Sequence, residues 1–307
     1  VTHTKATAER AAAIGYMARA TSADALAIGS GANASGGGST AVGASAVAIL
    51  DHAAAFGGNA QAIEDYATAL GANANASRSY SIAIGSADAA EDSAIAIGNG
   101  AQVTGSKSVA VGLNAQATKG DSSAYGAYAN ASGGSSSAYG NYATAFGKSS
   151  SAYGNNAVAS GDYSSAYGFY AEATGNSSSA YGRGAIASGG YSSAYGFAAE
   201  ATGDSSSAYG EDVKATGHVS SAYGSNAQAM GVFSSAYGAG ALASADKSIA
   251  IGSGYEIDDV TYNVKQTAAT AERAAAIGYL AQATSADALA IGSSANASGG
   301  GSIAVGA

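Results

Sequence analysis

Glycine recurs at every fourteenth position along this chain, and this period constrains the fold more than any other feature. The pentapeptide "SSAYG" first appears at 122–126 and returns with this period until 234–238. Glycines in the same position extend to both ends of the chain, and each of these 21 marker glycines has alanine two positions before it. The step from Gly85 to Gly98 is one position short, and the step from Gly252 to Gly278 is two positions short of a double repeat. Such a period predicts a solenoid, because stacked units bury small side chains that one unit cannot bury alone.

Each repeat unit divides into two equal halves, for example "SSAYGAY" (122–128) and "ANASGGS" (129–135). Both halves alternate with period two, which indicates short strands, and the glycines between them indicate turns. A heptad coiled coil is excluded, because 45 of the 307 residues are glycine and a helix would not tolerate glycine along its whole length. The sequence therefore predicts an all-β, parallel β-solenoid in which each repeat unit forms one coil.

The size of the side chains assigns the faces of each coil. The positions four and two before the marker glycine are small, as at Ser122 and Ala124, and those three and five after it are usually alanine, as at Ala129 and Ala131. We expect these two small faces to meet inside a thin roll, with sheets closer together than the usual ~10 Å. Such a thin roll is not expected to be stable alone.

The outer face of the first strand carries a bulky apolar stripe, one and three positions before each marker glycine. Outside the middle third it contains aliphatic pairs, and in the middle third serine with tyrosine fills it. The aliphatic pairs are Leu26/Ile28, Ile82/Ile84, Ile95/Ile97, Val109/Val111 and Ile249/Ile251. An uncovered stripe of this length would aggregate, so we expect copies of the chain to pack around an axis. Three copies suit a compact shared core, and spacing alone leaves two or four open. The predicted axis residues are Ile84, Val111, Tyr125, Tyr139, Tyr153, Tyr167, Tyr181, Tyr195, Tyr209, Tyr223, Tyr237 and Ile251.

The outer face of the second strand is mixed in character, four positions after each marker glycine. We expect this face to meet solvent, and any specific ligand to be recognised there. The candidate ligand face comprises Asn130, Thr144, Val158, Glu172, Ile186, Glu200, Lys214 and Gln228.

Charge and composition exclude several classes of function. The net charge of -9 disfavours nucleic acid as a partner, because no basic stripe neutralises phosphates. The three histidines, His3, His52 and His218, occupy unrelated positions of the repeat, so we expect no catalytic group, metal or cofactor. No apolar run approaches the roughly 20 residues that span a bilayer as a helix, so we expect no membrane contact by this part of the protein and any export signal or anchor to lie outside it.

The regular repeat is interrupted once, near residue 253. Residues 270–307 restate residues 7–44 with four differences. We therefore predict a first roll segment at 1–252, a connector or distorted coil at 253–266, and a duplicated second segment at 267–307. Continuing the repeat through the connector would place Tyr255 and Ile257 in slots that otherwise hold alanine.

Four stretches resemble the head repeats of trimeric autotransporter adhesins, the YadA-like heads. These are "SIAIGS" at 81–86, "SVAVG" at 108–112, "SIAIGS" at 248–253 and "SIAVG" at 302–306. The resemblance covers nearly the whole chain. It implies a left-handed β-roll, three rolls joined as a homotrimer, and display on the outer membrane of a Gram-negative bacterium. The serine and tyrosine form of the strand is not the commonest one in the family, which leaves the packing at the axis open.

The resemblance also implies a function. We expect a non-enzymatic adhesin head that binds host extracellular matrix proteins such as collagen, cell-surface receptors, other bacteria or abiotic surfaces. A structural spacer without a ligand is the first alternative. An ice-binding solenoid is a weaker one, because it needs a uniform solvent-facing grid of serine or threonine, whereas the serine rows lie in buried positions of the repeat.

Overall fold

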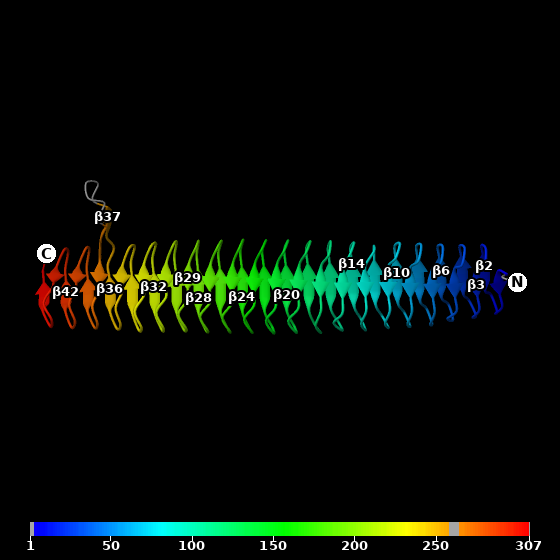
Figure 1. Ribbon diagram of the computed structural model, residues 1–307, viewed down its shortest axis with the longest axis horizontal. Coiled ribbons are helices and arrows are strands. Elements are labelled where there is room, and N and C mark those ends of the chain that lie inside the picture. Colours follow the sequence, from blue (N-terminus) through cyan, green and yellow to red (C-terminus); the bar gives the residue numbers. More distant parts are fainter. Residues whose placement is uncertain (1–2, 258–263, 307) are drawn as a thin grey trace. The chain divides into compact units, whose positions relative to one another are not determined.

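Small inward side chains alternate with larger outward ones along the chain, and each coil contains a pair of short strands. Figure 1 shows the stacked coils. The computed structural model describes residues 3–257 and 264–306. It contains two compact units, unit 1 at residues 1–150 and unit 2 at residues 151–307, which are described separately. In each unit, first strands pair only with first strands and second strands with second strands, so two parallel sheets form, and this confirms the predicted all-β parallel solenoid.

In unit 1, the first strands of the coils form one sheet. They are β2 (Ala12–Ile14), β4 (Leu26–Ile28), β6 (Thr40–Val42), β8 (Ala54–Phe56), β10 (Thr68–Leu70), β12 (Ile82–Ile84), β14 (Ile95–Ile97), β16 (Val109–Val111), β18 (Ser123–Tyr125) and β20 (Ser137–Tyr139). The second strands form the other sheet. They are β1 (Lys5–Ala6), β3 (Arg19–Ala20), β5 (Asn33–Ala34), β7 (Val47–Ala48), β9 (Gln61–Ala62), β11 (Asn75–Ala76), β13 (Asp88–Ala89), β15 (Gln102–Val103), β17 (Gln116–Ala117), β19 (Asn130–Ala131) and β21 (Thr144–Ala145).

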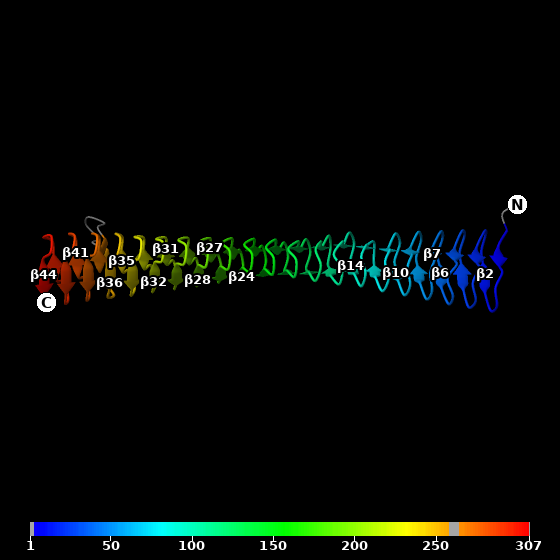
Figure 2. The ribbon, with the colours of Figure 1, turned by 90° about the horizontal axis from the view of Figure 1, so that it is seen from below.

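Unit 2 repeats this arrangement, with its strands side by side in Figure 2. Its first strands are β22 (Ser151–Tyr153), β24 (Ser165–Tyr167), β26 (Ser179–Tyr181), β28 (Ser193–Tyr195), β30 (Ser207–Tyr209), β32 (Ser221–Tyr223), β34 (Ser235–Tyr237), β36 (Ile249–Ile251), β40 (Ala275–Ile277), β42 (Leu289–Ile291) and β44 (Ile303–Val305). Its second strands are β23 (Val158–Ala159), β25 (Glu172–Ala173), β27 (Ile186–Ala187), β29 (Glu200–Ala201), β31 (Lys214–Ala215), β33 (Gln228–Ala229), β35 (Leu242–Ala243), β39 (Ala268–Ala269), β41 (Gln282–Ala283) and β43 (Asn296–Ala297).

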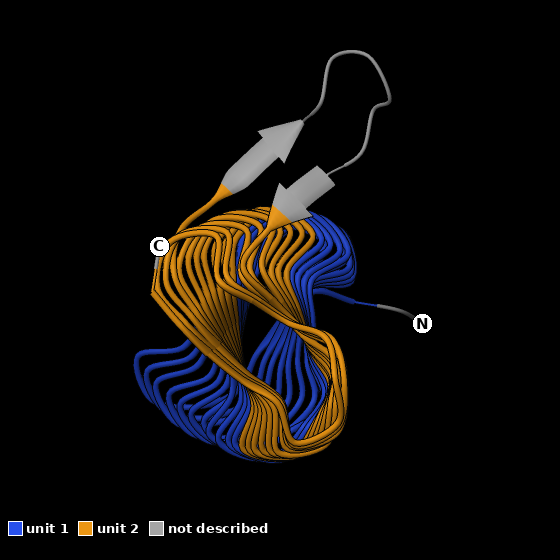
Figure 3. Ribbon diagram, turned by 90° about the vertical axis from the view of Figure 1, so that its left-hand side faces the viewer, with its two compact units in different colours: residues 1–150 blue, residues 151–307 orange. Residues whose placement is uncertain are grey.

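The core of each roll is a ladder of small side chains between the two sheets. Ser122, Ala124, Ala129 and Ala131 are all fully buried, as the sequence predicts. Viewed along the stack in Figure 3, successive coils of each unit have the same shape and are turned slightly relative to one another. In-register pairing keeps each repeat position in its own row from coil to coil, so an inward residue stays inward along the unit.

The buried serines four positions before the marker glycine fall into two groups. The Ser122 hydroxyl donates to the Lys119 carbonyl oxygen over 2.6 Å. Within the described residues, a second group has no hydrogen-bond partner for the hydroxyl. That group comprises Ser136, Ser150, Ser164, Ser178, Ser192, Ser206, Ser220 and Ser234. A buried hydroxyl without a partner loses its hydration and gains nothing in return, so these serines contribute less stability than Ser122.

The marker glycines are required by both backbone conformation and space. Gly182 has φ +140°, and a Cβ atom there would lie 2.2 Å from the carbonyl oxygen of Gly196 in the next coil. Any side chain would therefore separate the coils at the point where the first strand ends.

Each coil is closed by two turns, and a left-handed residue sits in both of them. It lies two positions after the marker glycine in the first turn and five positions before it in the second turn, as at Tyr170 (φ 55°) and Ser177 (φ 56°). The coil between Gly85 and Gly98 is one residue shorter than the others, and the missing residue is the left-handed one of the first turn. There, Ala87 and Ala89 take the two inward slots of the second strand.

The segment after Gly252 leaves the roll as strand β37 (Tyr255–Ile257), which pairs antiparallel with β38 (Val264–Gln266). In Figure 1, β37 projects sideways from the stacked coils of unit 2. The roll continues across this insertion, because β36 pairs directly with β40, and β35 with β39. Residues 258–263 of the predicted connector lie outside the described residues. The division into segments 1–252, 253–266 and 267–307 stays a prediction.

Candidate functional site

A row of stacked tyrosines runs along the outer face of the first sheet in unit 2. Neighbouring ring centroids lie 4.7 to 5.0 Å apart, with ring planes within 6° of parallel. This spacing follows the ~4.8 Å separation of paired strands. The tyrosine row comprises Tyr153, Tyr167, Tyr181, Tyr195, Tyr209, Tyr223 and Tyr237. In unit 1, Tyr125 and Tyr139 stack in the same way, with centroids 4.8 Å apart.

Two hydroxyl groups of the tyrosine row have a serine partner in the neighbouring coil. A side-chain hydrogen bond joins Tyr167 to Ser151, and another joins Tyr209 to Ser193. Burial raises the pKa of the Tyr167 phenol, neighbouring phenols raise it further, and the bond to Ser151 opposes them. The Tyr167 phenol is therefore held in its neutral form, and Ser151 satisfies its polar end.

The predicted aliphatic axis residues lie on the same outer face as the tyrosines of their own unit. Val111 pairs in register with Tyr125 in unit 1, and Ile251 pairs with Tyr237 in unit 2. Ile84 lies between Leu70 and Ile97. In the single chain this face is half-buried or exposed, as illustrated by Ile251 with 41% of its surface exposed. The packing of these residues against other chains stays a prediction.

The predicted ligand face forms one row on each unit's second sheet. Asn130 pairs in register with Thr144 in unit 1, and Val158 pairs with Glu172 in unit 2. The row of unit 2 continues through Ile186, Glu200, Lys214 and Gln228. All eight side chains are exposed or half-buried. This row and the tyrosine row occupy different sheets of the roll, and a role in ligand binding stays a prediction.

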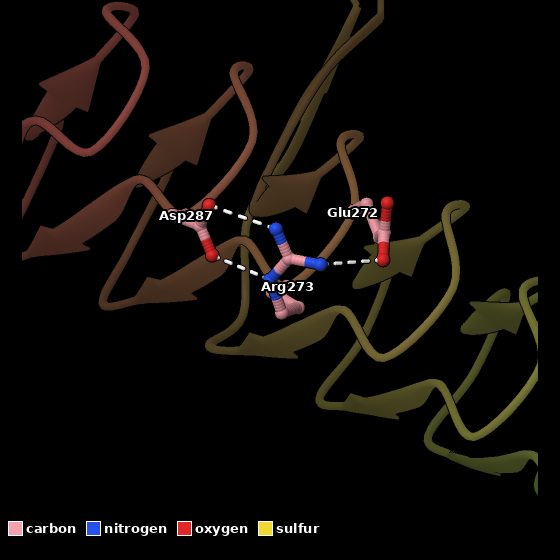
Figure 4. A network of polar contacts seen from close by, with 3 residues as sticks. All are labelled: Glu272, Arg273 and Asp287. Atoms are coloured by element: carbon pink, nitrogen blue, oxygen red, sulfur yellow. Dashed lines mark hydrogen bonds and ion pairs between the residues drawn. The ribbon is translucent and has the colours of Figure 1, made fainter.

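Charged side chains on this face and at the turns pair between coils. Lys214 Nζ lies 3.2 Å from Glu200 Oε2 on the second sheet. At a turn of unit 2, the Arg273 guanidinium bridges Asp287 in the next coil and Glu272 in its own coil (Figure 4). Hydrogen bonding from Arg273 lowers the pKa of the Asp287 carboxyl below its ordinary value. These pairs are exposed, so each adds little to stability.

In residues 3–257 and 264–306, no group of three or more histidine, cysteine, aspartate or glutamate side chains is placed to hold a metal ion. His52 instead stacks on Tyr66 at 5.0 Å, and His218 meets Phe233 edge-on at 6.1 Å. Over the same residues, no helix is long and apolar enough to cross a bilayer.

A set of exposed apolar side chains at the second turn was not predicted from the sequence. In unit 2, the residue five positions before the marker glycine is Tyr163, Tyr191, Val219 or Phe233 in four of the coils, with exposed fractions of 57%, 74%, 39% and 53%. We call these four residues the turn row. Their common position in the repeat could have identified them, but the alternation of inward and outward residues gives no information about turns.

Comparison with known proteins gives the family of the chain. The family model of the YadA head domain repeat (2 copies) matches more than half of the chain, at residues 6–32, 34–60, 62–87, 89–115, 104–129, 138–164, 145–171, 159–185, 229–254, 269–294 and 283–307. A search of curated proteins returned no match. Among solved structures, the chain is similar to the collagen-binding domain of the Yersinia adhesin YadA, with 32% identity and a TM-score of 0.32. That match covers 42% of this chain and 65% of the Yersinia chain, so less than two thirds of that domain is spanned. On the strength of the repeated family match, this chain belongs to the YadA head family, the head repeats of trimeric autotransporter adhesins.

Proposed function

We propose that the chain is a non-enzymatic adhesive head that works as a homotrimer at the tip of a surface fibre. The fibre would be anchored in the outer membrane of a Gram-negative bacterium, by parts of the protein outside these residues. In this proposal the first sheet faces the trimer axis, and the second sheet and the turns face the surroundings. The left-handed winding that the family resemblance implies belongs to the same proposal.

One observation carries the assembly part of the proposal, namely the asymmetry between the two outer faces. The first sheet presents a row of stacked phenol rings, with Tyr237 still 40% exposed in the single chain. The second sheet presents a mixed row that includes Glu172 and Lys214. A long apolar row of this kind is stable in water only when covered, and identical rows related by a symmetry axis cover one another.

The adhesive part of the proposal rests on family membership and on the repetition of the outer surface. Among the ligands that the family resemblance implies, collagen-like matrix proteins are the first to test, followed by cell-surface receptors. Successive coils place Glu172, Ile186 and Glu200 one strand apart on the second sheet. Many weak contacts along such a row would give strong attachment without a pocket.

A binding screen of the purified chain tests this function. Immobilised collagens, other matrix proteins and cultured cells are probed, with a stalk fragment of a fibre as the non-adhesive control. The variant Glu172→Ala/Glu200→Ala should stay assembled and bind more weakly. Glu211→Ala is the matched control, because it removes an exposed carboxylate from a turn of the same unit. Absence of binding to every surface by the wild-type chain would contradict the adhesive role and favour a structural spacer.

Ice binding is the weaker alternative, and the burial of serine argues against it. The serine row four positions before the marker glycine lies inside the roll, where Ser164 and Ser178 are fully buried. The exposed row of the second sheet mixes charged and aliphatic residues, so it offers no uniform hydroxyl grid. A measurement of thermal hysteresis tests this alternative, and the proposed function predicts none.

A further inference from the structure

Arg183 lies on the first turn of unit 2, between two phenylalanine rings. It takes the position directly after the marker glycine, and Phe169 and Phe197 take the same position in the coils before and after it. The Arg183 Cζ atom lies 5.7 Å from the ring centroid of Phe169 and 5.6 Å from that of Phe197. Both distances are typical of a cation–π contact, so the two rings hold this guanidinium group at the turn.

Hydrogen bonds between successive turns fix this arrangement. The Gly184 amide donates to the Phe169 carbonyl, and the Ala198 amide donates to the Arg183 carbonyl, both over 2.9 Å. Because paired strands lie ~4.8 Å apart, the backbones that carry the two phenylalanines are separated by about 9.6 Å, with the arginine halfway between them. The backbone of the roll therefore keeps the cation in place, in addition to the contacts that its own side chain makes.

The positive charge of Arg183 is held but not neutralised. At two second turns, an arginine pairs with an aspartate of the next coil, as in Arg10–Asp24 and Arg273–Asp287. Arg183 meets a phenylalanine in both adjoining coils instead. Among the described residues, its guanidinium group has no hydrogen bond or ion pair. A guanidinium group has five N–H donors that suit a carboxylate, so this one is available to an anion from outside the chain.

An open space lies beside Arg183. The next residue of the turn is Gly184, and a Cβ atom added there would meet no atom within 4 Å apart from its two chain neighbours. Adjoining coils carry Tyr170 and Ala198 at this position, with φ 55° and 49°, so the turn accepts a side chain. The space therefore has an aromatic ring in one adjoining coil and only a methyl group in the other.

The Tyr170 ring is the apolar wall of this space. It packs edge-on against Phe169, with ring centroids 4.4 Å apart, and 51% of the residue surface is exposed. The turn thus combines a fixed cation, an exposed aromatic ring and free volume in two adjacent coils. An anionic group attached to a small ring with an apolar face matches these three features.

Negative charges on the same turn limit the size of the anion. Glu211 and Asp212 are exposed there, two coils beyond Arg183 and about 9.6 Å along the stack. This distance exceeds the Debye length of ~8 Å at physiological salt, so one anionic group at Arg183 is largely screened from these two carboxylates. A polyanion that lay along the stack would meet them directly. The site therefore favours a ligand with a single carboxylate.

We propose that Arg183, Tyr170 and Gly184 form a binding site for a terminal sugar acid of a glycan. The sugar carboxylate pairs with the Arg183 guanidinium group, and the apolar face of the sugar ring packs against Tyr170 in the space over Gly184. The inference rests on the proposed function, because the turns must face the surroundings. It assigns a class of cell-surface ligand to the first turn, separate from the row on the second sheet.

NMR saturation transfer to soluble sugars tests the proposal with the purified chain. The probes are sialyllactose and glucuronic acid, which carry a carboxylate, and uncharged lactose. At least one of the two acids should bind, and lactose should not. Arg183→Gln should weaken binding of the acid by about tenfold or more, as loss of a charged hydrogen bond does. Arg78→Gln makes the same change at an exposed arginine of unit 1, and it should bind like the wild type.

A second variant distinguishes a sugar site from a simple ion pair. Tyr128 and Tyr142 occupy the position of Gly184 in adjacent coils of unit 1, and their rings stack at 4.8 Å. Gly184→Tyr should therefore fold, fill the open space and cover the Tyr170 ring, while the charge of Arg183 stays. It should weaken binding of the sugar acid by about tenfold or more, as loss of an aromatic contact in a binding site does. Unchanged binding by this variant would overturn the sugar site.

The remaining outcomes separate this inference from the proposed function. If the wild-type chain attaches to matrix or cells but binds neither acid, or if Arg183→Gln binds the acid as the wild type does, the proposed site is wrong. A short glutamate peptide that binds as tightly as the sugar acids would identify acidic protein as the ligand and would also overturn the proposal. If the wild-type chain attaches to no matrix protein, cell or sugar, the adhesive function itself is wrong.

Discussion

Tyr167 and Tyr181 lie in adjacent coils with ring centroids 4.7 Å apart and ring planes only 4° from parallel. The two rings stack because their strands are paired in register. The spacing between paired strands is close to the separation of two stacked rings. Repetition of this contact turns one tyrosine per coil into a continuous outer surface. In the proposed trimer, other copies of the chain cover that surface.

Replacing one ring by a charge tests the predicted axis. Tyr167→Asp places a carboxylate within the tyrosine row, and an unpaired charge in a buried interface typically costs roughly 3 kcal/mol or more. We expect the variant to dissociate at protein concentrations that keep the wild type assembled, as measured by sedimentation. Tyr191→Asp, on the exposed second turn, is the control and should stay assembled. A fully assembled and equally heat-stable Tyr167→Asp variant would show that this face is not the axis.

The two groups of buried serines predict opposite responses to the same change. Ser122→Ala removes a hydrogen bond to the Lys119 carbonyl and should lower the free energy of unfolding by about 1 kcal/mol. Ser178→Ala removes a buried hydroxyl that has no partner among the described residues, so it should be neutral or stabilising. Chemical denaturation of the two variants measures their free energies of unfolding. Equal losses of stability would mean that the Ser178 hydroxyl is hydrogen-bonded in solution.

Backbone conformation predicts a contrast between two positive-φ positions of unit 2. Gly182→Ala should destabilise the roll by more than about 1 kcal/mol, because φ is unfavourable and the new Cβ meets the Gly196 backbone. Val219→Asn should stabilise it by up to about 1 kcal/mol, because asparagine tolerates the left-handed conformation that strains valine. Thermal unfolding of the two variants measures both changes in stability. A stabilising Gly182→Ala would contradict the tight stacking of coils at the marker glycines.

The sequence was sufficient to predict the coil but not its turns. Period and side-chain size placed Ser122 and Ala124 inside and Tyr125 outside, since a thin roll admits only small residues and strands alternate strictly. Val219 and Tyr191 are not the glycine or asparagine that usually marks the left-handed conformation, so only their position in the repeat, and not the residues themselves, could have indicated it. The serine partner of Tyr167 depends on the register of adjacent coils.

The turn network of Figure 4 predicts the titration of one carboxyl group. Arg273 lowers the pKa of Asp287 below the ordinary value of 3.8. The Arg273–Asp287 pair therefore contributes its full stabilisation when the pH is above the pKa of Asp287 in the unfolded chain. This contribution is lost as the pH falls through the lower pKa of Asp287 in the folded chain. By NMR titration, the midpoint of Asp287 should lie below 3.8, and Arg273→Gln should raise it. The equivalent pair in unit 1, Arg10 and Asp24, is the internal control, whose midpoint should not change. If the titration midpoint of Asp287 is the same in the Arg273→Gln variant as in the wild type, the two side chains are not paired.

The mass of the isolated chain in solution tests whether the tyrosine row forms the axis of a trimer. If the tyrosine row covers itself around a symmetry axis, sedimentation equilibrium of the purified chain should give three times the 29.1 kDa of one chain. That mass should persist on dilution, because the apolar faces are not stable in water alone. A stable, folded species of 29.1 kDa would contradict the account, since the exposed tyrosine row would then need no partner.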